Sequence, residues 1–156
     1  MGHLTSPLSV PMGRGARVVL AEDDRELRTL LAGMLRRDGY VVAEAVSGWG
    51  LLEQLTARAE RWDDFDLIIS DIVMPEFSGL DVLETLKKVG GLPRAHIPIV
   101  LITAFGDEPV HVRARQLGAR LFDKPFDLEE LRSFVAKVAP PVDELDSLYR
   151  DYGGEG

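Results

Sequence analysis

Short apolar runs alternate with helical patterns along most of this chain, and no other feature constrains its fold as strongly. The run at 18–21, for example, is followed by apolar residues at 27, 30, 31, 34 and 35, whose spacing places them on one helix face. Such alternation is typical of a parallel sheet with crossover helices. Because the runs are apolar at nearly every position, helices must cover both faces of the sheet. The sequence therefore predicts a three-layer α/β sandwich.

Five strand–helix units are expected within one domain at residues 16–139. The predicted strands are at 18–21, 40–45, 67–69, 99–102 and 120–122. The predicted helices are at 27–35, about 48–59, about 80–89, 107–117 and 128–138. Gly39 is expected to end the first helix, and Asp107 and Asp127 are placed to cap the last two.

The segments on either side of this domain have a different composition. Residues 1–15 are rich in Gly, Pro and Ser and have no periodicity, so we expect a flexible leader or the remnant of a tag. Residues 140–156 begin with two prolines and are then acidic, with Leu145, Leu148 and Tyr149 as the only sizeable apolar group. They are expected to form an acidic tail, a short docking helix or the start of a linker.

Composition excludes several classes of site and partner. The chain has no cysteine, which rules out disulfides, thiolate metal sites and a cysteine nucleophile. Its formal net charge of −8 disfavours direct binding of nucleic acid. No stretch approaches the roughly 18 apolar residues of a membrane helix, and residues 1–15 lack the apolar centre of a signal peptide. We therefore expect a cytoplasmic protein without a membrane segment.

Polar side chains follow four of the predicted strands at the point where each ends. These residues are Glu22, Asp23 and Asp24 after the first strand, Asp71 after the third, Thr103 after the fourth and Lys124 after the fifth. Because ligands bind beyond the carboxyl ends of the strands in open parallel sheets, these residues are the candidates for a functional site.

Three carboxylates brought together need a compensating cation, since each pair about 4 Å apart costs on the order of 4 kcal/mol. All-oxygen ligands favour Mg²⁺, which Asp23 and Asp71 would hold with support from Glu22. The Asp71 carboxylate would then be the nucleophile of a phosphoryl transfer. Lys124 would neutralise one phosphoryl oxygen, and Thr103 would donate a hydrogen bond to another.

Each residue also has an ordinary structural explanation. An acidic run before a helix often caps it, and Asp24 is expected to be such a cap. An Asp or a Thr at the end of a strand is commonly a turn residue, and a single Lys is usually solvated. What favours a functional site is the combination, because acid, acid, hydroxyl and cation at successive strand ends suit one phosphate.

The chain resembles the response-regulator receiver family over residues 16–139. The matching motifs are VLAEDD ending at Asp24, DIVMP beginning at Asp71 with Gly79 after it, TA at Thr103 and KPF at Lys124. The resemblance implies a flavodoxin-like (βα)5 sandwich with parallel strand order 2-1-3-4-5. It also implies that Asp71 is the phosphoacceptor, that the Mg²⁺ ligands are Glu22, Asp23, Asp71 and the backbone carbonyl of Val73, and that the bond before Pro125 is cis.

The resemblance further implies a phosphorylation-dependent switch of a two-component system, which catalyses only its own Mg²⁺-dependent phosphorylation and dephosphorylation. A sensor histidine kinase or a phosphotransfer protein would donate the phosphoryl group. Thr103 would move towards it, and the aromatic Phe122 would turn inward, unless Phe122 is simply a core residue. The surface formed by residues 107–117, 120–122 and 128–138 would then bind a downstream protein or a second copy of the chain. The identity of the kinase and the target is left open.

Two further groups near these positions invite hypotheses. Val73 and Phe105, two residues after Asp71 and Thr103, are both apolar, so we expect them to slow hydrolysis of the phosphorylated Asp71 by failing to orient water. His111, Arg113 and Arg115 form a small basic cluster, which is either a solvated helix face or a docking surface for an acidic partner.

Two other classes of protein fit the residues less well. A doubly wound Mg²⁺ phosphatase would need a second acid near the nucleophile, whereas residue 73 is a valine. A nucleotide or flavin carrier would need a glycine-rich turn after the first strand, where Glu22, Asp23 and Asp24 would instead repel phosphate.

Overall fold

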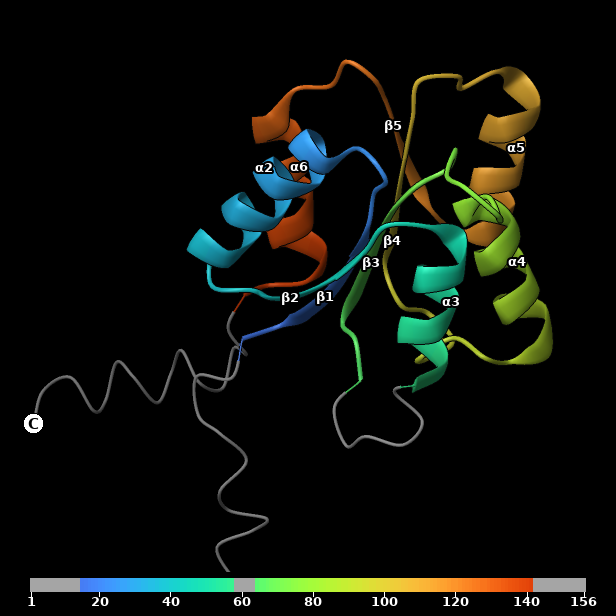
Figure 1. Cartoon of the computed structure of the whole chain (residues 1–156), viewed down its shortest axis with the longest axis horizontal. Coiled ribbons are helices and arrows are strands. Elements are labelled where there is room, and N and C mark those ends of the chain that lie inside the picture. Colours follow the sequence, from blue (N-terminus) through green and yellow to red (C-terminus); the bar gives the residue numbers. More distant parts are fainter. Residues whose placement is uncertain (1–14, 58–63, 142–156) are drawn as a thin grey trace, which may run out of the picture.

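A computed structural model of the chain describes residues 15–57 and 64–141, and shows one parallel sheet (Figure 1). The strands are β1 (Arg17–Ala21), β2 (Val41–Ala45), β3 (Leu67–Asp71), β4 (Ile99–Thr103) and β5 (Arg120–Asp123). Their order is β2-β1-β3-β4-β5, as the resemblance implied, and every neighbouring pair is parallel, as the sequence pattern predicted. Residues 1–14 of the predicted leader at 1–15 and residues 142–156 of the predicted tail at 140–156 lie outside the described residues.

Helices cover both faces of the sheet, which confirms the three-layer sandwich. They are α2 (Arg25–Arg37), α3 (Gly48–Ala57), α4 (Gly79–Val89), α5 (Glu108–Leu117) and α6 (Leu128–Val138). Figure 1 shows α2 and α6 on one face and α3, α4 and α5 on the other. In the described parts of the chain, no helix has the length and apolar character needed to cross a membrane.

Side-chain caps fix where the helices begin on the site side of the sheet. The carboxylate of Asp24 accepts hydrogen bonds from the backbone of Glu26 and Leu27, and Asp107 and Asp127 cap α5 and α6 in the same way. These three caps were predicted from the sequence. Ser78 caps α4 by accepting a hydrogen bond from the backbone of Asp81. Each cap satisfies backbone N–H groups that the first helical turn leaves unpaired.

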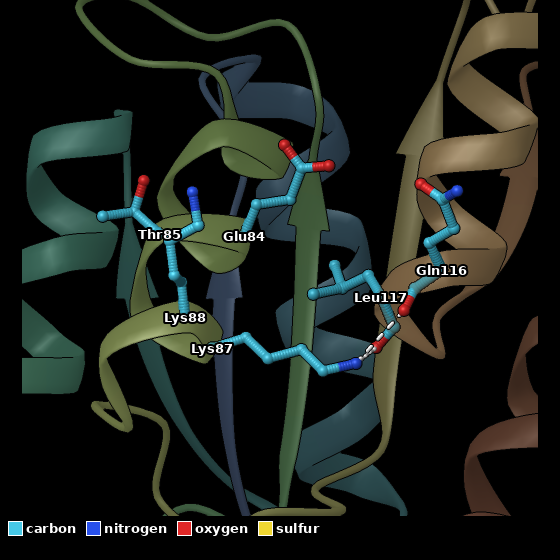
Figure 2. Close-up of a pocket in the computed structure, with 6 residues that line it drawn as sticks. All are labelled: Glu84, Thr85, Lys87, Lys88, Gln116 and Leu117. Atoms are coloured by element: carbon cyan, nitrogen blue, oxygen red, sulfur yellow. Dashed lines mark hydrogen bonds between the residues drawn. The ribbon is translucent and has the colours of Figure 1, made fainter.

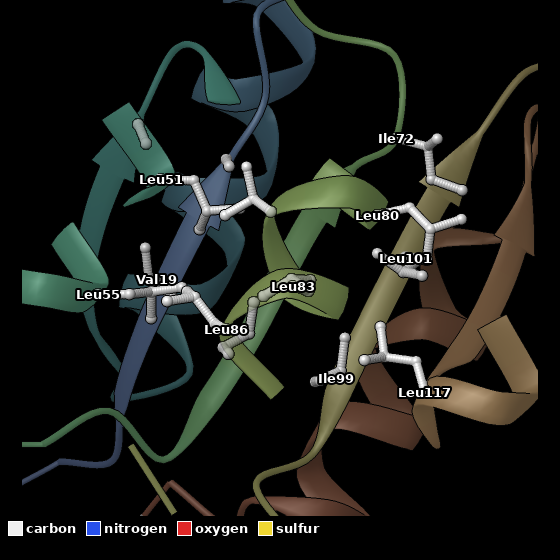
Figure 3. Packing of buried hydrophobic residues seen from close by; sticks show 14 of the residues in the cluster. Val19, Leu51, Leu55, Ile72, Leu80, Leu83, Leu86, Ile99, Leu101 and Leu117 are labelled. Carbon is white, nitrogen blue, oxygen red and sulfur yellow. The ribbon is translucent and has the colours of Figure 1, made fainter. Parts of the chain in front are cut away.

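The core is divided by the sheet into two apolar layers, because successive strand residues point to opposite faces. Val18 and Leu20 of β1 pack in the layer beneath α2 and α6, whereas Val19 and Ala21 pack in the layer beneath α3, α4 and α5. Figure 3 shows the second layer, with leucines of α3 and α4 lying against β1 and β4. The two layers hold the strands rigidly, so the polar residues at the strand ends have defined positions.

Candidate functional site

The structure brings Asp71, Glu22 and Lys124 together at the carboxyl end of the sheet. The Nζ of Lys124 lies 2.8 Å from Oδ2 of Asp71 and 3.3 Å from Oε1 of Glu22. Asp71 ends β3, Glu22 follows β1 and Lys124 follows β5. Glu22 and Lys124 are therefore 102 positions apart in the sequence. The convergence that was predicted from the strand ends is therefore present for the two buried acids and the lysine.

Asp71 is held from the loop that follows it. Its Oδ1 accepts a hydrogen bond of 3.2 Å from the backbone N–H of Val73, and its side chain is only 6% exposed. The loop then returns so that the backbone N–H of Gly79 donates to the carbonyl of Ile72 at 3.0 Å. A Cβ at Gly79 would collide with the Asp71 carbonyl and with the Ser70 side chain, so only glycine permits α4 to begin this close to the strand end.

The acidic turn after β1 places a third carboxylate beside these groups. Oxygen atoms of Glu22, Asp23 and Asp71 all lie within 4.8 Å of one another. Glu22 is buried and Asp23 is exposed, so the group has one side open to solvent. Oxygen ligands with one open side are the kind of donor set that Mg²⁺ takes, since it usually keeps several waters.

The electrostatics of the pocket favour the binding of a cation. Burial raises the pKa of Glu22 to about 7, and the hydrogen bond and charge of Asp71 add to the increase. Burial opposes the charge of Lys124, but its hydrogen bonds and ion pairs with Asp71 and Glu22 still raise the pKa of that amine. One ammonium therefore faces more than one carboxylate, and a divalent cation fits the excess of negative charge.

Thr103 joins the same site through β4 and its partner strand. It is buried, its Oγ1 accepts a hydrogen bond of 3.0 Å from the backbone N–H of Phe105, and its carbonyl accepts one of 2.7 Å from the backbone N–H of Lys124. The bond between Lys124 and Pro125 is cis, which confirms a prediction drawn from the resemblance. A backbone hydrogen bond thus joins Thr103, which carries the hydroxyl, to Lys124, which carries the ammonium.

Comparison with known proteins adds to this geometry. Residues 18–136, well over half of the chain, match the family model described as "Response regulator receiver domain". The chain belongs to this family. It is therefore the receiver domain of a two-component response regulator and a phosphorylation-dependent signalling switch, which confirms the family, the fold and the broad function expected from the sequence.

Relatives of this receiver differ in the share of their length that the chain covers. It is 27% identical to "Sporulation initiation phosphotransferase F" of Bacillus subtilis, over 80% of this chain and 94% of that protein. It is 34% identical to "Transcriptional regulatory protein CpxR" of Escherichia coli, over 78% of this chain but only 47% of CpxR. The chain thus spans about half the length of CpxR and 28% of "DNA-binding transcriptional regulator NtrC" of Rhizobium meliloti.

A solved structure similar to this receiver contains Mg²⁺. The response regulator TrrA from Thermotoga maritima, in complex with Mg²⁺-BeF, is 27% identical and has a TM-score of 0.65, covering 79% of this chain and 98% of that one. Receiver domains bind Mg²⁺ at an acidic pocket, and this receiver has such a pocket at Glu22, Asp23 and Asp71.

Val73 and Phe105 lie at the rim of the pocket with their side chains directed to solvent. Val73 is 55% exposed and Phe105 is 73% exposed, although their backbone N–H groups bind Asp71 and Thr103. The receiver therefore presents two apolar side chains next to its reactive groups, as the sequence predicted. Their effect on hydrolysis stays a prediction, as does the role of the Val73 carbonyl as a metal ligand.

Phe122 lies in the core beneath α6. It is 4% exposed, and its ring packs edge-on against Phe126 and Phe134 at centroid distances of 6.1 Å. The guanidinium of Arg120 lies over the ring, 4.7 Å from its centroid. This placement favours the alternative that Phe122 is a core residue of β5.

The apolar β5 residue on the same side of the sheet as the Thr103 side chain is Leu121, since Asp123, the register partner of Thr103, is charged. Leu121 pairs with Leu101 in the register of β4 and β5, and both pack in the layer beneath α3, α4 and α5. Thr103 is two residues beyond Leu101 and so shares this face. The sequence analysis did not select Leu121, although the two-residue period of a strand would have found it.

The basic cluster of α5 is largely paired within the receiver. Arg113 bonds Asp81 at 2.6 Å and Glu84 at 3.1 Å, both on α4. His111 Nε2 lies 3.4 Å from the Asp123 carboxylate, and Arg115 lies 3.5 Å from Glu108. These contacts tie α5 to α4 and β5, and they explain the cluster without an acidic partner.

A groove between α4 and α5 lies apart from the acidic pocket (Figure 2). It has a volume of about 650 Å³ and is lined by Glu84, Thr85, Lys87, Lys88, Gln116 and Leu117. The side chain of Lys87 extends across the groove, and its Nζ donates to the last carbonyls of α5, at 3.1 Å from the oxygen of Gln116 and 3.2 Å from that of Leu117. The groove contains none of the predicted site residues. Lys87 stabilises the contact between the two helices.

Proposed function

We propose that Asp71 is the residue that accepts the phosphoryl group, from the phosphohistidine of a sensor histidine kinase or of a phosphotransfer protein. The observation that carries this proposal is the contact of 2.8 Å between Asp71 and Lys124 inside a group of carboxylates at the sheet edge. A carboxylate oxygen of Asp71 attacks phosphorus, the bond between phosphorus and the donor's imidazole nitrogen breaks, and an acyl phosphate forms. The departing imidazole takes up a proton.

The ligands proposed for Mg²⁺ are the carboxylates of Asp23 and Asp71, with Glu22 in support and the Val73 carbonyl completing the set. When bound, the metal neutralises phosphoryl oxygens during transfer. The fit rests on the clustered oxygens and on the raised pKa of Glu22, which burial and the Asp71 charge produce. The open side of the pocket, next to the exposed Asp23, leaves room for a phosphoryl group.

Lys124 and Thr103 are proposed to bind the other phosphoryl oxygens. The ammonium of Lys124 already contacts the Asp71 carboxylate, so it needs little movement to reach an oxygen attached there. The Thr103 hydroxyl currently accepts a hydrogen bond from the backbone of Phe105, which leaves its proton available to a phosphoryl oxygen. Both residues act by positioning and charge neutralisation, the main contributions a protein makes to phosphoryl transfer.

The output of the switch is proposed to be the surface formed by α5, β5 and α6. The backbone bonds between Thr103, Phe105 and Lys124 connect the pocket to the start of α5 and the end of β5, so movement of Thr103 reaches this surface. Its partner is proposed to be a downstream protein or a second copy of the chain. We propose neither direct binding of nucleic acid by the receiver nor chemistry on outside substrates, and the cytoplasmic location stays a prediction.

Phosphorylation by a small-molecule donor tests the proposal without a known kinase. Incubation with acetyl phosphate and Mg²⁺ should add one phosphoryl group to the intact protein, as measured by mass spectrometry. The variant Asp71→Asn should show no addition while its circular dichroism stays that of a folded protein.

The matched control is Asp107→Asn, because asparagine caps a helix about as well as aspartate. This variant should be phosphorylated like the wild type. Undiminished labelling of Asp71→Asn, or labelling that is independent of Mg²⁺, would contradict the proposal.

A further inference from the structure

The Asp23 carboxylate is not held in place by contacts of its own. Asp23 is exposed, and in the described parts of the chain its carboxylate makes no hydrogen bond or ion pair. Glu22 and Asp71, by contrast, are buried and bonded to Lys124. The two peptide groups that flank Asp23 therefore set the direction of its Cα–Cβ bond, from which the carboxylate extends.

The peptide group after Asp23 is fixed by the acidic turn itself. The backbone N–H of Asp24 donates to Oε2 of Glu22 at 3.1 Å. The side chain of Asp24 then accepts from the backbone of Glu26 at 2.9 Å and of Leu27 at 3.3 Å. These bonds attach the turn to the beginning of α2.

The peptide group before Asp23 is fixed by Arg28. The Nη1 of Arg28 donates to the carbonyl oxygen of Glu22 at 2.8 Å, and that carbonyl belongs to the same planar unit as the N–H of Asp23. On the other side of Glu22, the backbone N–H donates to the carbonyl of Ala45 at 3.0 Å. Rotation of the Glu22–Asp23 peptide would break the bond to Arg28.

Arg28 is itself anchored and largely removed from solvent. Its Nε lies 3.2 Å from Oε1 of Glu44 on β2, and its side chain is 15% exposed. Glu44 is held in turn by Arg36, whose Nη1 lies 3.0 Å from Oε2. A planar guanidinium bonded in two directions has one orientation, which a flexible ammonium would not have.

We propose that Arg28 is a positioning residue for the Mg²⁺ site, acting on Asp23 through the peptide that precedes it. This inference rests on the proposed function, since it assumes that Asp23 is a metal ligand. Groups outside the ligand set that orient the ligands typically change metal affinity by about 10- to 100-fold when they are removed.

A purely electrostatic role for Arg28 would have the opposite consequence. Arg28 is a cation near an acidic cluster, so its removal would by charge alone make Mg²⁺ bind more tightly. Loss of positioning makes Mg²⁺ bind more weakly. A role limited to stabilising the fold would lower the unfolding temperature and leave the affinity unchanged. The sign of the change in Kd therefore separates the three roles.

The experiment is a titration of the full chain with Mg²⁺ alone, followed by NMR through the amide of Val73, which is bonded to Asp71. For Arg28→Met we expect a Kd about tenfold or more above that of the wild type. Arg28→Gln carries the same expectation, so the test does not depend on the folding of one variant. Arg28→Lys, which keeps a donor and the charge, should lie between these variants and the wild type.

The matched control is Glu44→Gln, which removes the charge of the ion pair but keeps a side-chain oxygen that can accept from Nε of Arg28, so that Arg28 can still bond the Glu22 carbonyl. Its Kd should stay within about twofold of the wild type. As a second measurement, the rate of phosphorylation by acetyl phosphate in Arg28→Met should return to the wild-type rate at saturating Mg²⁺.

Two results would overturn the inference, and a third would overturn the proposed function. An unchanged or lower Kd in Arg28→Met and Arg28→Gln would show that Arg28 does not position Asp23. An equal increase in Glu44→Gln would assign the effect to the ion pair with β2. A wild-type protein that does not bind Mg²⁺ would contradict the proposed metal site itself.

Discussion

The two ends of the parallel sheet are held together by different kinds of interaction. At the amino end, backbone groups pair with one another: Ala16 donates to Pro141 at 3.0 Å, Val41 donates to Ala16 at 2.9 Å and Asp66 donates to Arg17 at 2.7 Å. At the carboxyl end, backbone bonds such as that from Lys124 to the carbonyl of Thr103 are joined by a cluster of charged side chains, with Lys124 between Glu22 and Asp71. The amino end is satisfied internally, whereas the carboxyl end keeps unbalanced charge.

This difference separates stability from function along the strands. Neutral hydrogen bonds between buried groups each add about 1 kcal/mol and leave nothing reactive. Clustered carboxylates raise the free energy of the folded state unless a cation joins them. Functional sites commonly contain such destabilising groups. Changes at the carboxyl end should therefore alter phosphorylation and pH dependence, and changes at the amino end should alter stability alone.

The largest stability effect is expected from Glu22→Gln in the absence of divalent cations. Because burial and the Asp71 charge raise the pKa of Glu22 from 4.5 to about 7, the folded state binds this proton more tightly than the unfolded state does. The stabilisation is complete below pH 4.5 and is lost as the pH rises through about 7. It amounts to roughly 3 kcal/mol. The free energy of unfolding of Glu22→Gln should fall correspondingly less over this range, as measured by urea titrations at each pH.

Addition of Mg²⁺ provides the control for this measurement. A bound cation stabilises the ionised form of Glu22, so the wild-type free energy of unfolding should depend less on pH when Mg²⁺ is saturating. Parallel pH profiles for the wild type and Glu22→Gln without metal would show that Glu22 does not carry the charge imbalance of the carboxyl end.

The fold could be predicted because its determinants are periodic. Apolar runs without alternation specified buried parallel strands, and aspartates at residues 24, 107 and 127 marked the beginnings of helices that the structure confirms. The caps worked as signals because they act within three residues of their own position. Strand order was supplied by the resemblance to the family and agrees with the structure.

The site was only partly predictable, because residue type does not give the direction of a side chain or the backbone group that it contacts. Residue types at the strand ends indicated that Asp71, Glu22 and Lys124 would meet, because parallel strands end at one edge. Phe122 was a candidate for the switch because it is aromatic, yet strand alternation directs it away from the face that Leu121 shares with Thr103. The bond from Arg28 to the Glu22 carbonyl could not be predicted, because every residue has a carbonyl and residue type does not select one.

An effect of intermediate size, on the rate of acyl phosphate hydrolysis, is expected from substitutions of the exposed residues at the carboxyl end. Val73→Asn combined with Phe105→Glu would place polar groups beside Asp71 that can orient a water molecule for attack on the acyl phosphate. We expect phosphate to be lost about tenfold faster, less than the hundredfold or more of an optimised general base. The decay of the labelled protein after removal of acetyl phosphate measures this rate.

The matched control for this pair of substitutions is Val89→Asn. Val89 is 70% exposed but lies at the far end of α4, so it is similar in chemistry and distant from Asp71. Its acyl phosphate should decay at the wild-type rate. An unchanged half-life in the double variant would refute the idea that apolar neighbours protect the phosphorylated aspartate.

The smallest effect is expected from Tyr40→Phe at the amino end. The Tyr40 hydroxyl is buried and donates to the carbonyl of Ala139 at 2.7 Å, which joins the start of β2 to the end of α6. Burial, with help from the Asp38 charge, raises the pKa of Tyr40 to about 12, so the hydroxyl keeps its proton at neutral pH. Its removal leaves a buried carbonyl without a donor and should cost about 1 kcal/mol of unfolding free energy. Phosphorylation by acetyl phosphate should keep its wild-type rate, the reverse of the pattern expected for Asp71→Asn. A slower phosphorylation of Tyr40→Phe would mean that the two ends of the sheet are coupled, and that the division between a stabilising end and a reactive end does not hold.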